Sequence, residues 1–155
     1  AAVSACKYPP QGTRGVAGSP RAAGYTGNAM SYLSSANDET IVMIAVETTE
    51  AVENLDEILG VDGLDGIFIG PMDLASSMGH LGNPNHPDAR TQIEIIEKKV
   101  LASDKFLGTV ATTVDKAKHC FDIGYQWLVV IQDGAALLQA GKRKVTEFRN
   151  QYGNE

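Results

Sequence analysis

Acidic side chains follow three short apolar runs of the sequence. Glu47 follows TIVMIAV, Asp73 follows GIFIGPM, and Asp133 follows WLVVIQ. Residues at the carboxyl ends of parallel strands form the functional face of α/β folds. Two carboxylates from neighbouring strands offer the hard oxygen ligands that Mg²⁺ and Mn²⁺ prefer. Glu47 and Asp73 are therefore candidate metal ligands. The alternative is that each acid caps the helix after it, which is the interpretation we adopt for Asp133.

A Gly-Pro pair separates the second apolar run from Asp73. Gly70 lets the backbone approach a ligand closely, and Pro71 fixes φ and carries no N–H donor. The N–H groups of Met72 and Asp73 then lie at the start of a turn, where an anion such as a carboxylate can bind. These four residues are candidate substrate-binding residues, and an ordinary strand-ending turn is the alternative.

Four consecutive βα units would position these residues. Strands are expected at 40–47, 66–70, 106–111 and 127–132, and helices at 48–61, 88–104, 113–124 and from 133 onward. The apolar strands are continuous rather than alternating, as in a parallel sheet buried on both faces. The pattern fits either a small doubly wound sheet or half of a (β/α)₈ barrel, which needs about 250 residues in full. The first six residues resemble the end of a helix already under way, which favours the half barrel.

Charge and composition exclude several classes of partner. The net charge is −6 and the basic residues are scattered, which argues against nucleic acid. No apolar run approaches the roughly 20 residues of a membrane span, and no signal peptide is visible. Cys6 and Cys120 are expected to be free thiols, and the location to be cytoplasmic.

Four segments of the chain strongly resemble the HpcH/HpaI aldolase family. They are KYPPQGTRG, IAVETTEAVENLDEI, GVDGLDGIFIGPMDLASSMGHLGNPNHPD and FLGTVATT…GYQWLVV. The family comprises class II, metal-dependent pyruvate aldolases of the phosphoenolpyruvate/pyruvate barrel superfamily. The resemblance implies a (β/α)₈ TIM barrel, of which residues 1–155, as a single domain, cover about the C-terminal half, strands 5 to 8 with their helices.

The resemblance also implies a reaction and its site. The reaction is reversible aldol cleavage of a 4-hydroxy-2-oxo acid to pyruvate and an aldehyde through a metal-stabilised enolate. The family's metal ligands match Glu47 and Asp73, with Mg²⁺, Mn²⁺ or Co²⁺ as the cation, and Met72 and the backbone of Asp73 would lie against the pyruvate carboxylate. Ala45 stands where the family has Gln, which removes one polar contact from the substrate pocket.

Some family residues have no counterpart in this chain. The catalytic His, its paired Asp and a pyruvate-binding Arg are expected upstream of residue 1, so the catalytic residues are unknown. We expect His80 near the rim, His86 in a turn and His119 midway along a helix, none of them replacing that base. Trp127 is expected to pack between a strand and a helix.

The resemblance finally implies a homo-oligomer, often a hexamer, that exchanges its last helix between subunits. Residues 134–150 would be that helix. Two other functions stay open. One is a related lyase or decarboxylase acting on oxaloacetate, similar to macrophomate synthase. The other is a truncated, non-catalytic assembly or binding module.

Overall fold

One parallel sheet forms the centre of the molecule. The computed structural model describes residues 1–25 and 27–153. Its strands are β1 (Met43–Val46), β2 (Gly66–Ile69), β3 (Phe106–Val110) and β4 (Trp127–Val129). Its helices are α1 (Ala2–Cys6), the 3₁₀ helix η1 (Arg21–Ala23), α2 (Ala29–Glu39), α3 (Thr49–Glu53), α4 (Leu55–Leu59), α5 (Pro71–Ser77), α6 (Pro87–Leu101), α7 (Val114–Ile123) and α8 (Asp133–Tyr152).

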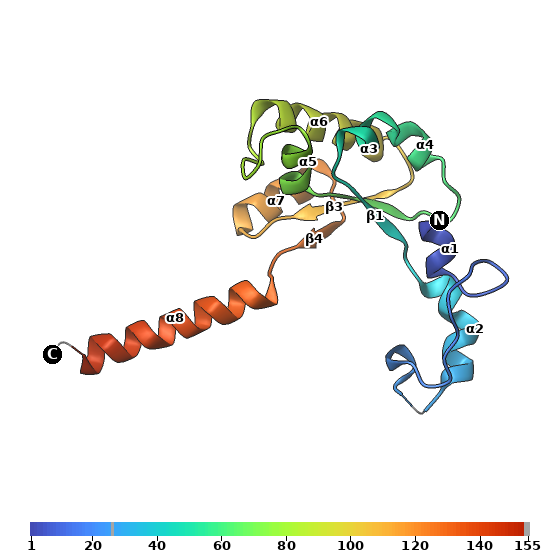
Figure 1. Cartoon of the computed structure of the whole chain (residues 1–155), viewed down its shortest axis with the longest axis horizontal. Helices are drawn as coiled ribbons and strands as arrows, with labels where there is room; N and C mark the ends of the chain where they lie inside the picture. Colours follow the sequence, from blue (N-terminus) through green and yellow to red (C-terminus); the bar gives the residue numbers. More distant parts are fainter. Residues whose placement is uncertain (26, 154–155) are drawn as a thin grey trace.

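The strand order decides between the two architectures that the sequence left open. All strands are parallel and lie in the order β1-β2-β3-β4. Right-handed crossovers between successive neighbours place every intervening helix on the same face. Figure 1 shows α3 to α7 gathered on one side of the sheet. This arrangement is a sector of a (β/α)₈ barrel, because a doubly wound sheet carries helices on both faces.

The two faces of the sheet are buried to different extents. On the helix side, Val46, Ile67 and Leu107 are fully buried, and α6 packs against them with Ile96 and Val100. On the other side, alternate residues line an open hollow: Met43, Ala45, Phe68, Phe106 and Trp127. The strands therefore alternate between a covered face and an uncovered one, and the expected burial on both faces is wrong for the described residues.

Trp127 lies on the uncovered face. Its ring centroid is 5.6 Å from that of Phe68, in an edge-to-face arrangement, and 48% of the residue is exposed. The prediction that Trp127 packs between a strand and a helix is therefore wrong. Register explains its placement, because Trp127 pairs with Gly108 and shares that residue's face.

Most element boundaries match the prediction within a few residues. The helix expected over residues 48–61 is divided at Asn54 into α3 and α4. Thr48 and Thr113 cap α3 and α7, each accepting a hydrogen bond from a backbone N–H three residues on. The last strand, expected to extend to residue 132, ends at Val129, and Val130 is 54% exposed.

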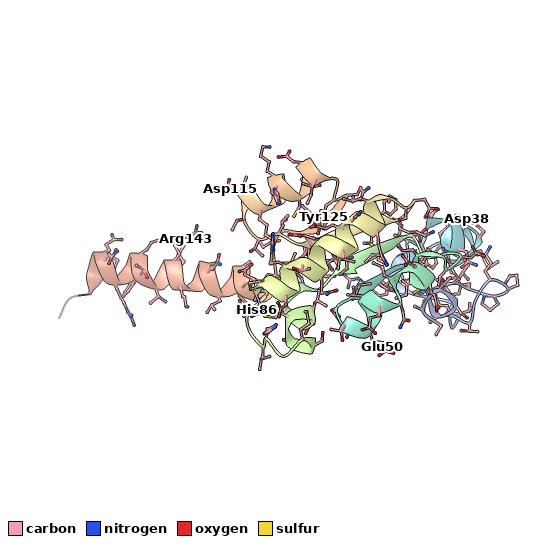
Figure 2. The ribbon with its side chains drawn as sticks, turned by 90° about the horizontal axis from the view of Figure 1, so that it is seen from above. Asp38, Glu50, His86, Asp115, Tyr125 and Arg143 are labelled. Carbon is pink, nitrogen blue, oxygen red and sulfur yellow. The ribbon has the colours of Figure 1, made fainter. Side chains whose placement is uncertain are left out.

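Helix α8 extends away from the rest of the chain. Figure 2, in which Arg143 labels this helix, shows it from above. None of its residues is buried. It begins at Asp133, as predicted, and extends two residues beyond 134–150, the segment that the resemblance implies is exchanged between subunits.

Two exclusions drawn from the sequence can be compared with the structure. Among the described residues, no helix has both the length and the apolar character needed to cross a membrane. Cys6 and Cys120 are both free, as expected.

Tyr125 offers a test of the packing between β4 and α6. Its side chain is buried, and its hydroxyl donates a 2.8 Å hydrogen bond to Glu97 Oε1. Burial, followed by that hydrogen bond, raises the pKa of Tyr125. The folded chain thus holds the phenolic proton more tightly than the unfolded chain does. The stability that protonated Tyr125 contributes is therefore fully present below about pH 10 and is lost as the pH rises further.

We therefore predict that Tyr125→Phe lowers the free energy of unfolding by about 1 kcal/mol at neutral pH. It should also flatten the loss of stability above about pH 10. Urea unfolding across that range measures both effects. Tyr152→Phe is the control, because Tyr152 is exposed on α8. An unchanged alkaline slope in the Tyr125 variant would contradict the prediction.

Candidate functional site

Glu47 and Gly70 lie side by side at the carboxyl edge of the sheet. Val46, the last residue of β1, pairs with Ile69, the last residue of β2. Glu47 and Gly70 follow these two residues directly, and the Gly70 N–H donates a 3.4 Å hydrogen bond to the Val46 carbonyl. The parallel register thus brings the first candidate metal ligand beside the Gly-Pro pair.

The Glu47 side chain packs directly on Gly70. A Cβ added to Gly70 would lie 3.0 Å from the Glu47 Cβ and would overlap the carboxylate oxygen Oε2. Glycine therefore allows a close approach here, although the sequence analysis expected a ligand rather than a side chain of the protein at this contact. The group that approaches is the carboxylate of Glu47, which is half-buried at this position.

Asp73 lies in the first turn of α5, the short helix that begins after Gly70. Pro71 is its first residue, a position where the missing N–H costs nothing. Asp73 is exposed, and Met72 beside it is 50% exposed. Leu74 and Ala75 are fully buried and anchor the helix to the core. The structure therefore presents Asp73 at the same edge of the sheet as Glu47.

Neither acid is the N-cap of the helix that follows it, although Asp73 places its charge in the first turn of α5. Thr48, not Glu47, caps α3 and accepts a 3.1 Å hydrogen bond from Ala51 N. Gly70 is the N-cap of α5, so Asp73 does not cap that helix. Within residues 1–25 and 27–153, neither the Glu47 nor the Asp73 carboxylate forms a hydrogen bond or ion pair.

Asp133 differs from the capping prediction in detail. It is the first residue of α8, and the N-cap is Gln132. Its Oδ1 accepts a 2.7 Å hydrogen bond from the next N–H, that of Gly134. Its negative charge still lies in the first turn of α8, where it interacts favourably with the positive end of the helix dipole.

Ala45 lies two residues before Glu47, on the same face of β1. It is exposed and lines the open hollow with Phe68. Its methyl group presents no hydrogen-bonding atom to that space, so the surface next to Glu47 is apolar here.

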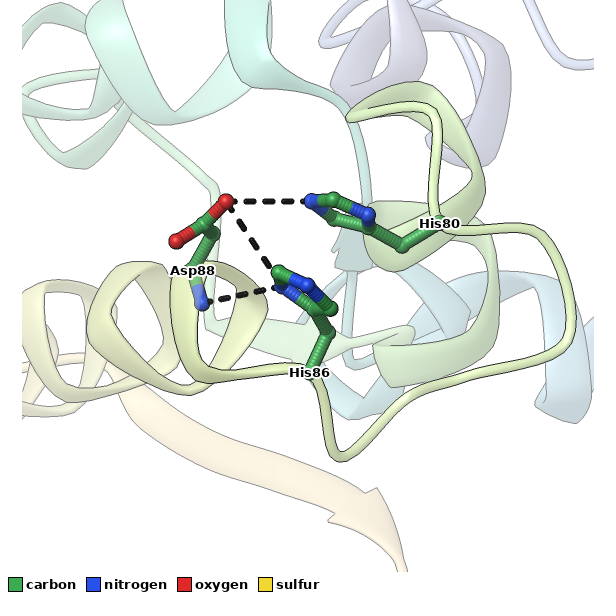
Figure 3. Close-up of side chains that lie close together, drawn as sticks. All are labelled: His80, His86 and Asp88. Carbon is green, nitrogen blue, oxygen red and sulfur yellow. Dashed lines mark hydrogen bonds and ion pairs between the residues drawn. The ribbon is translucent and has the colours of Figure 1, made fainter.

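Two histidines and an aspartate form a cluster that the sequence analysis did not join. His80 Nε2 lies 3.1 Å from Asp88 Oδ2, and His86 Nδ1 lies 3.6 Å from the same oxygen (Figure 3). The two imidazole rings stack with 3.4 Å between centroids. His86 is the N-cap of α6 rather than only a turn residue. The sequence did carry a signal for this cluster, because His80, His86 and Asp88 all lie within nine residues of one another around the start of a predicted helix.

The third histidine behaves as predicted. His119 lies midway along α7 and is exposed.

Residues 1–140 match the profile of a family described as HpcH/HpaI aldolase/citrate lyase. The chain belongs to this family. It is 39% identical over 149 residues to a hydroxypyruvate/pyruvate aldolase of Cupriavidus necator, and 42% identical over 149 residues to a 2-keto-3-deoxy-L-rhamnonate aldolase of Klebsiella pneumoniae. Both matches cover 96% of this chain and 55% of the relative.

A solved structure supports the family and the fold together. It is a HpcH/HpaI aldolase/citrate lyase family protein from Burkholderia cenocepacia, matched with a TM-score of 0.79 and 34% identity over 95% of this chain and 58% of that one. This chain therefore spans about half the length of the relatives that it matches. The prediction of a partial barrel from this family is confirmed.

The contact between Glu47 and Gly70 gives a second prediction. Gly70→Ala should lower the free energy of unfolding by about 1–3 kcal/mol, because the new methyl group overlaps the Glu47 side chain. In a Glu47→Ala background the same change should cost clearly less, because the carboxylate is gone. Urea unfolding of the four proteins gives the coupling free energy.

Gly134→Ala is the matched control. A Cβ at Gly134 would meet no atom within 4 Å, so this change should be neutral or slightly stabilising. Equal costs of Gly70→Ala in the two backgrounds would contradict the prediction that the Glu47 carboxylate contributes to the cost, because Glu47→Ala keeps only the Cβ contact.

Proposed function

We propose that the protein is a carbon–carbon lyase that cleaves a 4-hydroxy-2-oxo acid reversibly into pyruvate and an aldehyde. The observation that carries this proposal is the packing of Glu47 on Gly70, beside the exposed Asp73, at the carboxyl edge of a parallel sheet. Family membership and relatives named as aldolases of pyruvate-type substrates support the same reaction class.

Glu47 and Asp73 would hold a divalent cation, Mg²⁺ or Mn²⁺. Both offer carboxylate oxygens, the ligands that these hard cations prefer. Neither carboxylate has a partner among the described residues, and Gly70 leaves room for the Glu47 carboxylate. When bound, the cation supplies a Lewis acid that polarises a carbonyl group.

The start of α5 would bind the pyruvate carboxylate. Pro71 has no N–H, and the Leu74 N–H donates to the Gly70 carbonyl at 2.9 Å. The backbone N–H groups of Met72 and Asp73 are thus the free donors of this first turn. The apolar surface at Ala45 suits a part of the substrate that carries no polar atoms. The substrate would then be oriented by the N–H groups of Met72 and Asp73.

None of the three histidines is assigned as the general base. His80 and His86 contact Asp88, and His119 is exposed on α7. The general base, its paired Asp and the pyruvate-binding Arg therefore have no assigned counterpart among residues 1–155.

Helix α8 would join copies of the chain into a homo-oligomer. Five large apolar residues of α8 are exposed: Leu137, Leu138, Val145, Phe148 and Tyr152. At about 100° per residue they form a single stripe about 100° wide. An exposed apolar stripe on a helix without packing partners favours burial against a second copy. We propose that residues 134–150 are exchanged between subunits.

A metal titration tests the site. We predict that Mn²⁺ binds this chain, that pyruvate tightens the binding, and that Asp73→Ala and Glu47→Ala each weaken it by more than about tenfold. Isothermal titration calorimetry with and without pyruvate measures this. Asp133→Ala is the control, because Asp133 follows another strand and accepts a hydrogen bond from Gly134. Unchanged Mn²⁺ affinity in the Asp73 variant would exclude the assignment.

Sedimentation tests the helix exchange. We predict that Leu137→Glu combined with Phe148→Glu shifts the chain to a smaller species, because charges on the apolar stripe oppose its burial. Arg143→Glu serves as the control, since it lies on the opposite side of α8 by helical periodicity. The same mass for all three proteins would contradict an interface on this stripe.

A further inference from the structure

A second set of ligand atoms lies away from the Glu47–Gly70 edge. His80 lies in the loop between α5 and α6, and His86 and Asp88 lie at the start of α6, and each contributes one candidate ligand atom (Figure 3). These three atoms all lie within 4.8 Å of one another. His80 and His86 are partly buried, with 26% and 31% of their side chains exposed.

The backbone holds this arrangement in place. The His80 N–H donates to the Ala75 carbonyl at 2.8 Å, which fixes the start of the loop on α5. Two turns follow, closed by hydrogen bonds from Asn83 N to the His80 carbonyl at 3.0 Å and from His86 N to the Asn83 carbonyl at 3.1 Å. The chain thereby returns so that the two imidazoles stack.

The hydrogen bonding of His86 is also compatible with a role as a metal ligand. Its Nδ1 accepts a hydrogen bond from Asp88 N at 3.3 Å, so the lone pair of this nitrogen points toward Asp88. This hydrogen bond is long, and a cation on His86 Nδ1 would replace it as the partner of that nitrogen. Asp88 Oδ2 is the nearest carboxylate oxygen to both imidazoles and lies at the edge of the stacked pair (Figure 3).

Two of the three separations between ligand atoms are close to those of a tetrahedral centre. With metal–ligand bonds of about 2.0–2.2 Å, neighbouring ligand atoms of a tetrahedral zinc site lie about 3.3 Å apart. The two distances to Asp88 Oδ2, 3.1 Å and 3.6 Å, bracket that value. Because the two imidazoles stack nearly parallel, binding a cation requires one ring to rotate out of the stack so that both nitrogens face it.

We propose that His80, His86 and Asp88 bind a transition-metal cation of the Zn²⁺ class, with the remaining position open to water. Imidazole nitrogens favour Zn²⁺, Co²⁺ and Ni²⁺ over Mg²⁺, so the site differs in chemistry from the carboxylate pair Glu47 and Asp73. Its effect is structural. The cation fastens the loop after α5 to the first turn of α6, the helix whose Ile96 and Val100 lie in the core.

The test uses ZnCl₂ titrated by calorimetry into this chain after removal of metals. Saturable binding of one Zn²⁺ per chain is expected, and His80→Ala should weaken it by more than about tenfold. His80→Ala leaves His86 to cap α6. His119→Ala is the matched control, because His119 is exposed outside the cluster. Absence of saturable binding, or equal affinity in the His80 variant, would overturn the proposal.

Two further measurements keep the result interpretable. His80→Gln, a milder change, should show the same loss while far-ultraviolet circular dichroism reports an intact fold. Co²⁺ in place of Zn²⁺ should give visible absorption bands that disappear in His80→Gln and persist in Asp73→Ala. Bands that depend on Asp73 instead would assign the binding to the proposed aldolase site and overturn this inference.

Discussion

The parallel register of β1, β2 and β3 is the constraint on which the candidate site depends. It pairs Val46 with Ile69, and Ile69 with Thr109, so that successive strands end at one edge. The buried Thr109 hydroxyl reinforces this edge by donating to the Ile69 carbonyl at 3.1 Å. A shift of one residue would exchange the two faces of a strand. It would move Glu47 away from Gly70 and turn the core side chains toward solvent.

The same register leaves one face of the sheet uncovered. Gly66 and Gly108 lie where a Cβ would come within 3.0–3.2 Å of neighbouring atoms, including Met43 Cε. Gly66 leaves space for Phe106, and Gly108 leaves space for Trp127. Large and small residues therefore alternate on this uncovered face, where 43% of Phe106 and 48% of Trp127 remain exposed. Layers of this kind fill the interior of (β/α)₈ barrels.

Sequence reasoning predicted the βα units and the groups at their carboxyl ends because both leave local signals. Continuous apolar runs marked the strands, and the Gly-Pro pair marked the turn that carries Asp73. It could not predict which face of a strand is covered, because Ile67 and Phe68 are both apolar, and only the position of the helices distinguishes them. The stacking of His80 on His86 depends on the path of a loop, and hydrophobic periodicity carries no information about that path.

Helix α5 connects the two candidate sites physically. Its first turn carries Asp73, and the carbonyl of Ala75 accepts the hydrogen bond from His80 N. Leu74 and Ala75 are fully buried and anchor this short helix to the core. A cation held at His80 would therefore restrain the same element that sets the position of Asp73 and of the free N–H groups beside it.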